Sequence, residues 1–242
     1  MEKIFGRPES LKDVSSHYCP GCGHGIAHRL IAEAVDELGI RESVIGVTPI
    51  GCAVIAYDYW DFDCCEAAHG RALAVATAIK RVRPQNIVFT YQGDGDLAAI
   101  GTNETIHAAN RGENVTVVFI NNAVYGMTGG QMAPTTLLGQ KTATTPKGRD
   151  EKYQGFPLKI SELLAQLKGV KYVERVSLHT PPEVGKAKRA LKQAFGNQIN
   201  NVGFSLVEIL SPCPTYWGLS PTASLDWIRD TMSKEFPLGR IK

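Results

Sequence analysis

Two short polar segments of this 242-residue chain combine residue types that bind phosphate and a divalent metal ion. The first reads Gly-Asp-Gly-Asp at residues 93–96, and the second is the Asn-Asn pair at residues 121–122. Small glycines allow backbone N–H groups to approach a phosphate, and the amino end of a following helix favours negative charge. The carboxylate of Asp94 and the amide oxygen of Asn122 are hard ligands of the kind that Mg²⁺ prefers. Together the two segments predict a site for magnesium and a phosphorylated ligand.

Either segment alone is weak evidence for such a site. A Gly-Asp-Gly sequence is more often only a turn, and an Asn-Asn pair is more often only the start of a loop. Here, however, each follows a run of apolar and β-branched residues that is typical of a buried strand. Their joint occurrence at two strand ends favours the metal and phosphate site over two unrelated turns.

The cysteines are a second group of residues that could bind a metal or take part in redox chemistry. Cys19 and Cys22 form a C-x2-C pair, and Cys52 follows after 29 further residues. No second C-x2-C pair lies close enough to complete a zinc ribbon. The pair is compatible with structural zinc, a redox dithiol or half of an iron–sulfur site, and composition does not separate these three.

The apolar pattern predicts that helices and strands alternate along the chain. Helical spacing covers residues 25–38, 71–82, about 100–111, 160–167, 183–195 and about 224–233. Runs typical of strands cover residues 43–47, 86–91, 115–120, 170–176 and 204–210. Such alternation predicts an α/β fold with a doubly wound, mostly parallel sheet and helices on both faces.

The polar segments lie where such a fold binds its ligands. Ligands of open parallel sheets bind beyond the carboxyl ends of the strands, and Gly51, residues 93–96 and residues 121–122 all follow predicted strands. Residues 121–158 lack periodicity, and a loop of this length in a compact domain is usually functional or disordered. We expect one α/β domain over residues 1–200 and a C-terminal strand and extension over residues 201–242.

Composition limits the compartment and the partners. The 26 basic and 24 acidic residues leave a net charge of +2, which favours neither nucleic acid nor a membrane surface as partner. No apolar run approaches the roughly 18 residues that span a bilayer. Six cysteines are too few for a disulfide scaffold in a chain of this length. With no export signal at the start, we expect a reducing, cytoplasmic location.

The Gly-Asp-Gly segment, 25 intervening residues and the Asn-Asn pair resemble the signature of thiamine diphosphate-binding enzymes. In that family the aspartate, the second asparagine and the carbonyl two residues later hold Mg²⁺ on the diphosphate. The resemblance implies Asp94, Asn122 and the backbone carbonyl of Val124 as ligands. The sequence Tyr-Gly-Met-Thr-Gly-Gly-Gln at residues 125–131 narrows it to the β subunits of the 2-oxoacid:ferredoxin oxidoreductases.

This resemblance extends from about residue 18 to residue 150 and resumes around Cys213, and it implies two groups of site residues. The residues that it places at thiamine diphosphate are Ile50, Gly51, Cys52, His69, Gly70, Arg71, Gly93, Asp94, Gly95, Asp96, Asn122, Tyr125, Gly126, Met127 and Thr128. One [4Fe–4S] cluster is implied on Cys19, Cys22, Cys52 and Cys213. No catalytic residue is assigned to this chain itself, although His69 and Thr128 would support the chemistry. Arg71 is as compatible with a surface charge as with diphosphate binding.

The implied reaction is the oxidative decarboxylation of a 2-oxo acid to an acyl-CoA and CO₂, with electrons passing through the cluster to ferredoxin. In this family the glutamate that activates thiamine belongs to the α subunit, so we expect the isolated chain to be inactive. The chain has no C-x2-C-x2-C run. We therefore expect an α subunit and, for onward electron transfer, γ and ferredoxin-like δ subunits.

The substrate is the least specific part of the resemblance. Residues 127–136, 139–142 and 145–149 look most like the branched-chain, 2-oxoisovalerate type. Gly129 stands where some relatives have a lysine, which favours 2-oxoisovalerate over 2-oxoglutarate. The alternatives are a 2-oxoglutarate- or pyruvate-specific member, a non-redox thiamine decarboxylase or synthase, and a non-enzymatic zinc module.

Some chemically able residues remain outside these motifs. Cys64 and Cys65 match no ligand of the family, and adjacent cysteines do not easily form a disulfide with each other. We expect them to be buried thiols near the cofactor. Four other histidines are expected in packing or surface roles rather than as ligands, namely His24, His28, His107 and His179.

Overall fold

The structure is a computed structural model, and it describes residues 6–242. Its centre is a seven-stranded sheet with the order β2-β1-β3-β4-β6-β5-β7, in which every neighbouring pair is parallel except the antiparallel pair β5–β7. The strands are β1 (Val44–Pro49), β2 (Asp63–Ala67), β3 (Ile87–Gly93), β4 (Thr116–Asn121), β5 (Val170–Ser177), β6 (Phe204–Leu210) and β7 (Gly239–Arg240). The predicted fold class is confirmed.

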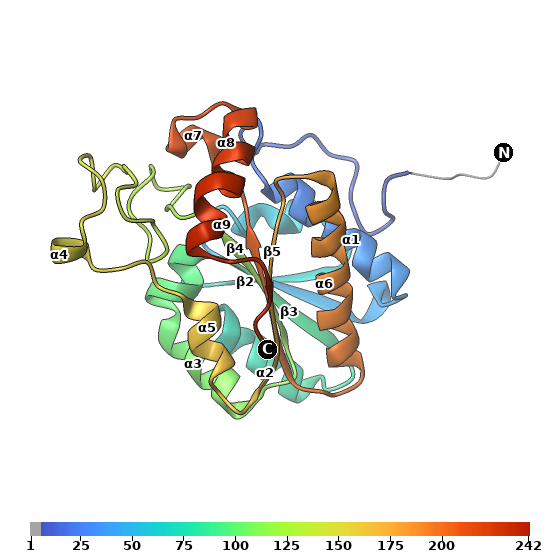
Figure 1. Cartoon of the computed structure of the whole chain (residues 1–242). Coiled ribbons are helices and arrows are strands. Elements are labelled where there is room, and N and C mark those ends of the chain that lie inside the picture. Colours follow the sequence, from blue (N-terminus) through green and yellow to red (C-terminus); the bar gives the residue numbers. More distant parts are fainter. Residues whose placement is uncertain (1–5) are drawn as a thin grey trace.

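Helices cover both faces of this sheet, as Figure 1 shows with α1 and α6 on one side and α2, α3 and α5 on the other. The helices are α1 (His24–Glu37), α2 (Ala72–Val82), α3 (Thr102–Arg111), α4 (Glu151–Gln154), α5 (Ile160–Ala165), α6 (Pro181–Ile199), α7 (Pro214–Trp217), α8 (Pro221–Trp227) and α9 (Ser233–Glu235). Two apolar cores, one on each face, hold the layers together. Every residue of β4 and β6 is therefore buried, which explains their continuous apolar runs.

Local sequence signals set several of the helix ends. The hydroxyl of Thr180 accepts a hydrogen bond from the N–H of Glu183 at the start of α6, and prolines occupy the first helical positions. Gly39 and Gly112 follow α1 and α3 with positive φ values of 63° and 67°, a conformation that glycine adopts without strain. These helix ends are therefore set by local capping residues.

Four features depart from the predicted elements. The sequence pattern does not predict the edge strand β2 or the 3₁₀ turn at Val54–Asp58. The helix after residues 93–96 begins with a π-helical turn at Asp96–Ile100 before α3 continues it. Residues 211–242 form three short α-helices, a second π-turn at Ile228–Met232 and the edge strand β7. The long loop contains only α4 and isolated bridges, as predicted.

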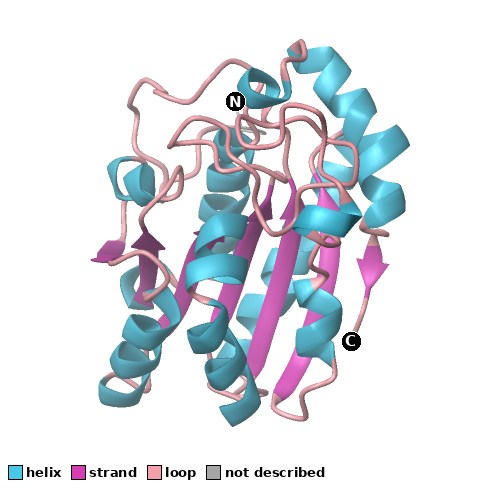
Figure 2. Ribbon diagram, turned by 90° about the vertical axis from the view of Figure 1, so that its left-hand side faces the viewer, coloured by secondary structure: helices cyan, strands magenta, loops and turns pink. Residues whose placement is uncertain are grey.

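The strand ends and the long loop meet at one end of the molecule. Figure 2 shows loops gathered above the carboxyl ends of the central strands. Strand β6 lies between β4 and β5, and the segment that follows it returns over the same end. The fold therefore brings residues 50–52, 93–96, 121–128 and 213 into one region.

Candidate cofactor and cluster site

A cavity opens at the carboxyl ends of the adjacent strands β1, β3 and β4. The residues that line it are His24, Ile50, Gly51, Cys52, Ala53, His69, Gly93, Asp94, Gly95, Asp96, Asn122, Val124, Tyr125, Gly126, Met127 and Thr128. Of the residues predicted to contact the cofactor, only Gly70 and Arg71 are absent from its wall. Among the predicted residues, the structure thus brings together positions as much as 78 apart, from Ile50 to Thr128.

Asp94 is a buried carboxylate in this wall, with 3% of its surface exposed. One of its oxygens accepts the N–H of Gly95 at 2.8 Å, and the other accepts the hydroxyl of Thr135 at 2.7 Å. Burial raises the pKa of Asp94 to about 6, and these hydrogen bonds oppose that rise. Within residues 6–242, no lysine or arginine forms an ion pair with it. Because a buried carboxylate without a cation is costly, this donor set fits a bound Mg²⁺.

The turn after β4 places the other two predicted magnesium ligands. Ala123 adopts a φ of 57°, which is uncommon for a residue other than glycine. The amide oxygen of Asn122 accepts the N–H of Val124 at 3.3 Å, and both residues line the cavity. Asp94, Asn122 and Val124 therefore share one cavity wall.

Asp96 fixes the orientation of His69 at the same cavity. One Asp96 oxygen lies 2.7 Å from Nδ1 of His69 and accepts the N–H of Gly70 at 2.6 Å. The other oxygen accepts a hydrogen bond from the side chain of Gln92 at 2.6 Å. A carboxylate on Nδ1 favours the proton at that nitrogen. Nε2 is then left free to act toward a ligand in the cavity.

Two glycines allow close approaches around these side chains. A Cβ on Gly95 would lie 2.0 Å from the ring of Tyr125, which packs directly over that glycine. A Cβ on Gly70, where φ is 76°, would lie 2.7 Å from the backbone of Ile100. Neither position accepts a larger residue without movement of its neighbour. The Gly-Asp-Gly segment is thus built for close packing as well as for phosphate approach.

Four free thiols line a second cavity that adjoins the first. Its walls contain all four predicted cluster ligands, Cys19, Cys22, Cys52 and Cys213. Burial raises the pKa of Cys52 to about 11 and that of Cys213 to about 12, and nearby thiols add to the shift at both. Cys19 is exposed and the other three cysteines are partly buried, and four thiols that line one cavity are suited to bind a group that stabilises thiolates.

The number of these thiols fits the ligand set of a cluster. A [4Fe–4S] cluster takes one thiolate on each of four separate irons. Four free cysteines line this one cavity, so the structure supplies that number of ligands in one place. Structural zinc can also take four cysteine ligands.

The two cavities share a wall. His24, Cys52, Asn122, Gly126 and Met127 line both of them. A Cβ on Gly126 would lie 3.1 Å from the Sγ of Cys52 and 3.9 Å from that of Cys213, so both thiols lie close to a residue without a side chain there. A cluster on the four thiols would be an immediate neighbour of a cofactor in the first cavity.

Some predicted residues lie elsewhere. Arg71 pairs with Glu104 at 2.8 Å and does not line the cavity, although Gly70 before it bonds Asp96. The prediction of buried thiols near the cofactor is wrong for Cys64 and Cys65. They are partly exposed on the edge strand β2, outside both cavities, because an edge strand has a neighbour on one side only.

Other contributing residues were missed in the sequence. His24 and Ala53 line the first cavity, and Thr135 and Gln92 bond its two aspartates. His24 was expected only to pack, and burial lowers its pKa to about 3. Its place two residues after Cys22 was a usable signal for proximity to the site. Thr135 lies in the aperiodic loop, where nothing in the sequence distinguishes it from neighbouring threonines.

Comparison with known proteins places these features in a wider context. A family model described as "Thiamine pyrophosphate enzyme, C-terminal TPP binding domain" matches residues 50–209. In addition, no helix within residues 6–242 has the length and apolar character needed to cross a membrane.

Several curated relatives and a solved structure are also similar. The "Ketoisovalerate oxidoreductase subunit VorA" of Methanothermobacter thermautotrophicus is 51% identical over all of this chain, which spans only 53% of that relative. The "2-oxoglutarate synthase subunit KorB" of Archaeoglobus fulgidus is 38% identical over 94% of this chain and 80% of its own length. A structure of 2-oxoglutarate:ferredoxin oxidoreductase from Magnetococcus marinus, with 2-oxoglutarate, coenzyme A and succinyl-CoA bound, has a TM-score of 0.79. It is 30% identical and covers 94% of this chain and 74% of that chain.

Proposed function

The chain belongs to the thiamine diphosphate-binding subunits of the 2-oxoacid:ferredoxin oxidoreductase family, and from that premise we propose that it holds the thiamine diphosphate and one [4Fe–4S] cluster of such an enzyme. The reaction that we propose is the CoA-dependent oxidative decarboxylation of a 2-oxo acid, with ferredoxin as electron acceptor. The chain spans about half the length of the VorA relatives. We propose that an α subunit supplies the glutamate that activates thiamine.

One observation carries this proposal. A cavity that contains a buried aspartate without a cationic partner shares its wall with a cavity lined by four free thiols. A thiamine enzyme without electron transfer needs only the first cavity, and a zinc module needs neither Asp94 nor Asn122. The pairing of both cavities favours an oxidoreductase over the two alternatives.

The residues of this chain would divide the work between them. When bound, thiamine diphosphate would supply the electron sink for loss of CO₂ and the cluster would supply a one-electron acceptor. Asp94, Asn122 and the carbonyl of Val124 would hold Mg²⁺, and the backbone at Gly95 would approach the diphosphate.

Other side chains of this chain would support the reacting part of the bound cofactor. His69, oriented by Asp96 through Nδ1, would present Nε2 as a hydrogen-bonding or proton-holding atom. Thr128 lies at the cavity wall, and its hydroxyl donates to Gln131 at 2.7 Å, which fixes its position. Met127 and Ile50, which are 46% and 41% exposed, give the rim an apolar character that would help to exclude water once a partner covers it.

We propose 2-oxoisovalerate as substrate, because two relatives that are 51% identical over the whole of this chain are named ketoisovalerate oxidoreductase subunits. The KorB relatives make 2-oxoglutarate the alternative. We also propose γ and ferredoxin-like δ subunits as partners, and the cytoplasm as location because free thiols persist in reducing compartments.

The test is to purify the native complex from its host without oxygen and to measure iron, sulfide and thiamine per chain. At least four irons and four sulfides and one thiamine diphosphate per chain are expected, because this chain would hold one cluster and a ferredoxin-like subunit would add its own. A complex with thiamine but no iron would identify a non-redox thiamine enzyme, and zinc without thiamine would identify an interaction module.

Rates of CoA-dependent ferredoxin reduction with 2-oxoisovalerate, 2-oxoglutarate and pyruvate then assign the substrate. A clear preference for 2-oxoglutarate would overturn the branched-chain assignment. The isolated chain should not reduce ferredoxin, and turnover by that chain alone would show that no partner glutamate is required.

A further inference from the structure

Two charged side chains lie fully buried beneath the turn at residues 121–124, and none of the roles above uses them. Glu208 on β6 and Arg175 on β5 are each 1% exposed and stand opposite one another in the register of the two strands. Nε of Arg175 lies 2.8 Å from the carboxylate of Glu208. The other guanidinium nitrogens donate to Glu162 at 2.8 and 2.7 Å, so the arginine is clamped between two acids.

The charges in this group are mutually satisfied. Burial alone would lower the pKa of Arg175, but the charges and hydrogen bonds of Glu208 and Glu162 raise it instead. A buried ion pair of this kind is weak evidence for stability, because apolar residues of similar size often do as well or better. Its placement therefore calls for a role other than holding the sheet together.

Glu208 connects the pair to the predicted magnesium turn. One of its oxygens accepts a hydrogen bond from Nδ2 of Asn121 at 2.7 Å, while the other accepts from Arg175 and from the hydroxyl of Ser161. With its nitrogen held in this way, the Asn121 amide turns its oxygen to the N–H of Ala123, which donates to it at 3.2 Å. The amide cannot flip without losing both bonds.

Ala123 is the residue of this turn that most needs support. Its positive φ costs about 1 kcal/mol or more unless the surroundings enforce it. Its carbonyl accepts from the hydroxyl of Thr136 at 2.7 Å and from the side chain of Gln140 at 3.1 Å. Its N–H donates to the side-chain oxygen of Asn121 and also hydrogen-bonds the carboxylate of Asp94.

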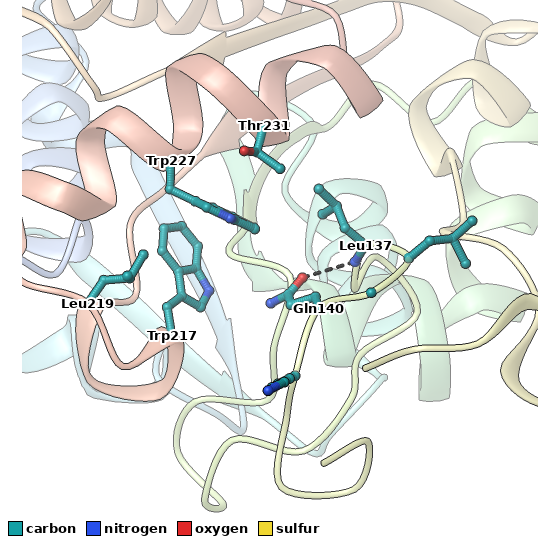
Figure 3. Close-up of a pocket in the computed structure, with 9 residues that line it drawn as sticks. Leu137, Gln140, Trp217, Leu219, Trp227 and Thr231 are labelled. Carbon is teal, nitrogen blue, oxygen red and sulfur yellow. Dashed lines mark hydrogen bonds between the residues drawn. The ribbon is translucent and has the colours of Figure 1, made fainter. Parts of the chain in front are cut away.

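The preceding carbonyl is held from the same outer side. Nε1 of Trp217 donates to the carbonyl of Asn122 at 2.9 Å. Figure 3 shows Trp217 and Gln140 at a hollow of about 390 Å³ between the long loop and the C-terminal helices. Thr136, Gln140 and Trp217 thus hold the carbonyl groups of this turn. Asn121, which Glu208 orients from the sheet, holds the N–H of Ala123.

We propose that Glu208, held by Arg175, is a positioning residue for the magnesium site, acting through Asn121 to hold the turn that presents Asn122 and Val124 to the ion. This inference rests on the proposed function, because it assumes that Asn122 and Val124 bind Mg²⁺. Indirect partners of metal ligands usually change metal affinity about 10- to 100-fold when they are replaced.

Only a carboxylate meets every demand at position 208. An ionised carboxylate accepts on both oxygens, whereas a glutamine has one acceptor and one donor. In Glu208→Gln, an oxygen kept toward Arg175 and Ser161 would turn the new NH₂ toward the NH₂ of Asn121. Two donors would then face each other, and the Asn121 amide would have to rotate away from Ala123.

The direction of the hydrogen bond between positions 208 and 121 can be reversed by a second substitution, which should restore the contact. In the double variant Glu208→Gln/Asn121→Asp, the glutamine NH₂ would donate to the new carboxylate at position 121. That carboxylate would still accept the N–H of Ala123, so the chain of hydrogen bonds is restored with its direction inverted. Each single variant breaks the chain, and the pair should show a large favourable coupling.

The experiment measures the Kd for Mg²⁺ at saturating thiamine diphosphate, together with the Tm, in the assembled enzyme after removal and return of both. We expect Glu208→Gln and Asn121→Asp each to raise that Kd about 10- to 100-fold, and the double variant to recover most of the loss. The matched control is Glu113→Gln. Glu113 is also a largely buried carboxylate, bound to Arg81 and Arg111, but it precedes β4 at the opposite end of that strand.

The possible outcomes distinguish a failure of this inference from a failure of the proposed function. A lower Tm with unchanged Mg²⁺ affinity in Glu208→Gln would assign the pair a structural role only and would overturn the inference. If that variant fails to accumulate, Asn121→Asp, which leaves the Glu208–Arg175 pair in place, must show the same loss. A wild-type enzyme that binds neither Mg²⁺ nor thiamine diphosphate would instead refute the proposed function, and the inference with it.

Discussion

Replacing Gly126 with alanine adds one carbon atom to the wall between the two cavities. The new Cβ would lie 3.1 Å from the Sγ of Cys52 and 3.9 Å from the Sγ of Cys213. Backbone strain does not contribute, because Gly126 does not adopt a positive φ. The closer sulfur would have to move by a few tenths of an ångström. Overpacking of this size costs about 1–3 kcal/mol.

That cost should appear mainly in the cluster-loaded form. Empty thiols can relax away from the added methyl group, whereas thiolates bound to a cluster cannot. We therefore expect Gly126→Ala to retain its cluster about 5- to 150-fold more weakly than the wild type. Iron and sulfide per chain, measured during anaerobic exposure to a chelator, report that change directly.

The matched control is Gly25→Ala, near the start of α1 and the cysteine pair. No atom lies within 4 Å of the Cβ that it would add, and alanine favours a helix by about 1 kcal/mol over glycine. This variant should keep its full iron content and unfold at the same or a higher temperature. A Gly126→Ala enzyme with full iron content and wild-type resistance to chelation would refute the reasoning.

Three further predictions concern the ion, the cofactor and a buried histidine. Asp94→Asn should weaken Mg²⁺-dependent binding of thiamine diphosphate, measured by calorimetry, by more than the about 10- to 100-fold that is typical of indirect partners of metal ligands. The Tm of the cofactor-free chain should stay unchanged or rise, because the substitution removes a buried charge. A lower Tm of the cofactor-free variant would contradict this. Removal of Mg²⁺ with a chelator should destabilise the loaded enzyme by about 2.7 kcal/mol if the free ion had been at a hundred times its Kd, and a Tm that ignores both chelator and added Mg²⁺ would speak against a bound ion. Burial holds the pKa of His28 well below its ordinary value of 6.5, so the unfolded chain takes up this proton first and stability falls as the pH drops below about 6.5. His28→Gln should remove up to about 2 kcal/mol of the loss between pH 7 and pH 5 in denaturant titrations, and an unchanged pH dependence would exclude His28 as its source.

The parts of the site that could be predicted from the sequence are those set by strand ends. Residues 93–96 and 121–122 each follow a strand that is buried on both faces, and such strands have unmistakable apolar runs. Because parallel strands end at one edge of the sheet, these motifs had to meet there. The position of Asp94 beside Asn122 thus follows from local pattern and fold class alone.

Contacts between distant segments could not be predicted in this way. Thr135 is 41 positions from Asp94, and Glu208 is 87 positions from Asn121. The run that contains Glu208 is a strand with all residues buried, so its single acid is the one available signal. Its partner Arg175 sits across the β5–β6 pair, and no sequence periodicity specifies that register.

The edge strand β2 was not predicted from the sequence, for a different reason. Its sequence Asp-Cys-Cys-Glu-Ala has neither the continuous apolar run of a central strand nor a strict alternation. It pairs only with β1, and that pairing supplies a stability that its own residues do not indicate. The misplacement of Cys64 and Cys65 follows from the same gap, because their exposure depends on a strand that the sequence does not reveal.

Short segments that line both cavities would couple the two proposed centres. Cys52 follows the same strand end as Ile50 and Gly51, and it lines both cavities. Cys213 directly precedes α7, whose last residue, Trp217, bonds the carbonyl of Asn122. A shift of α7 would move a thiol and the magnesium turn together. Because the turn is also held from the sheet by Glu208, a loss of the cluster should loosen the magnesium site less than a loss of that carboxylate does.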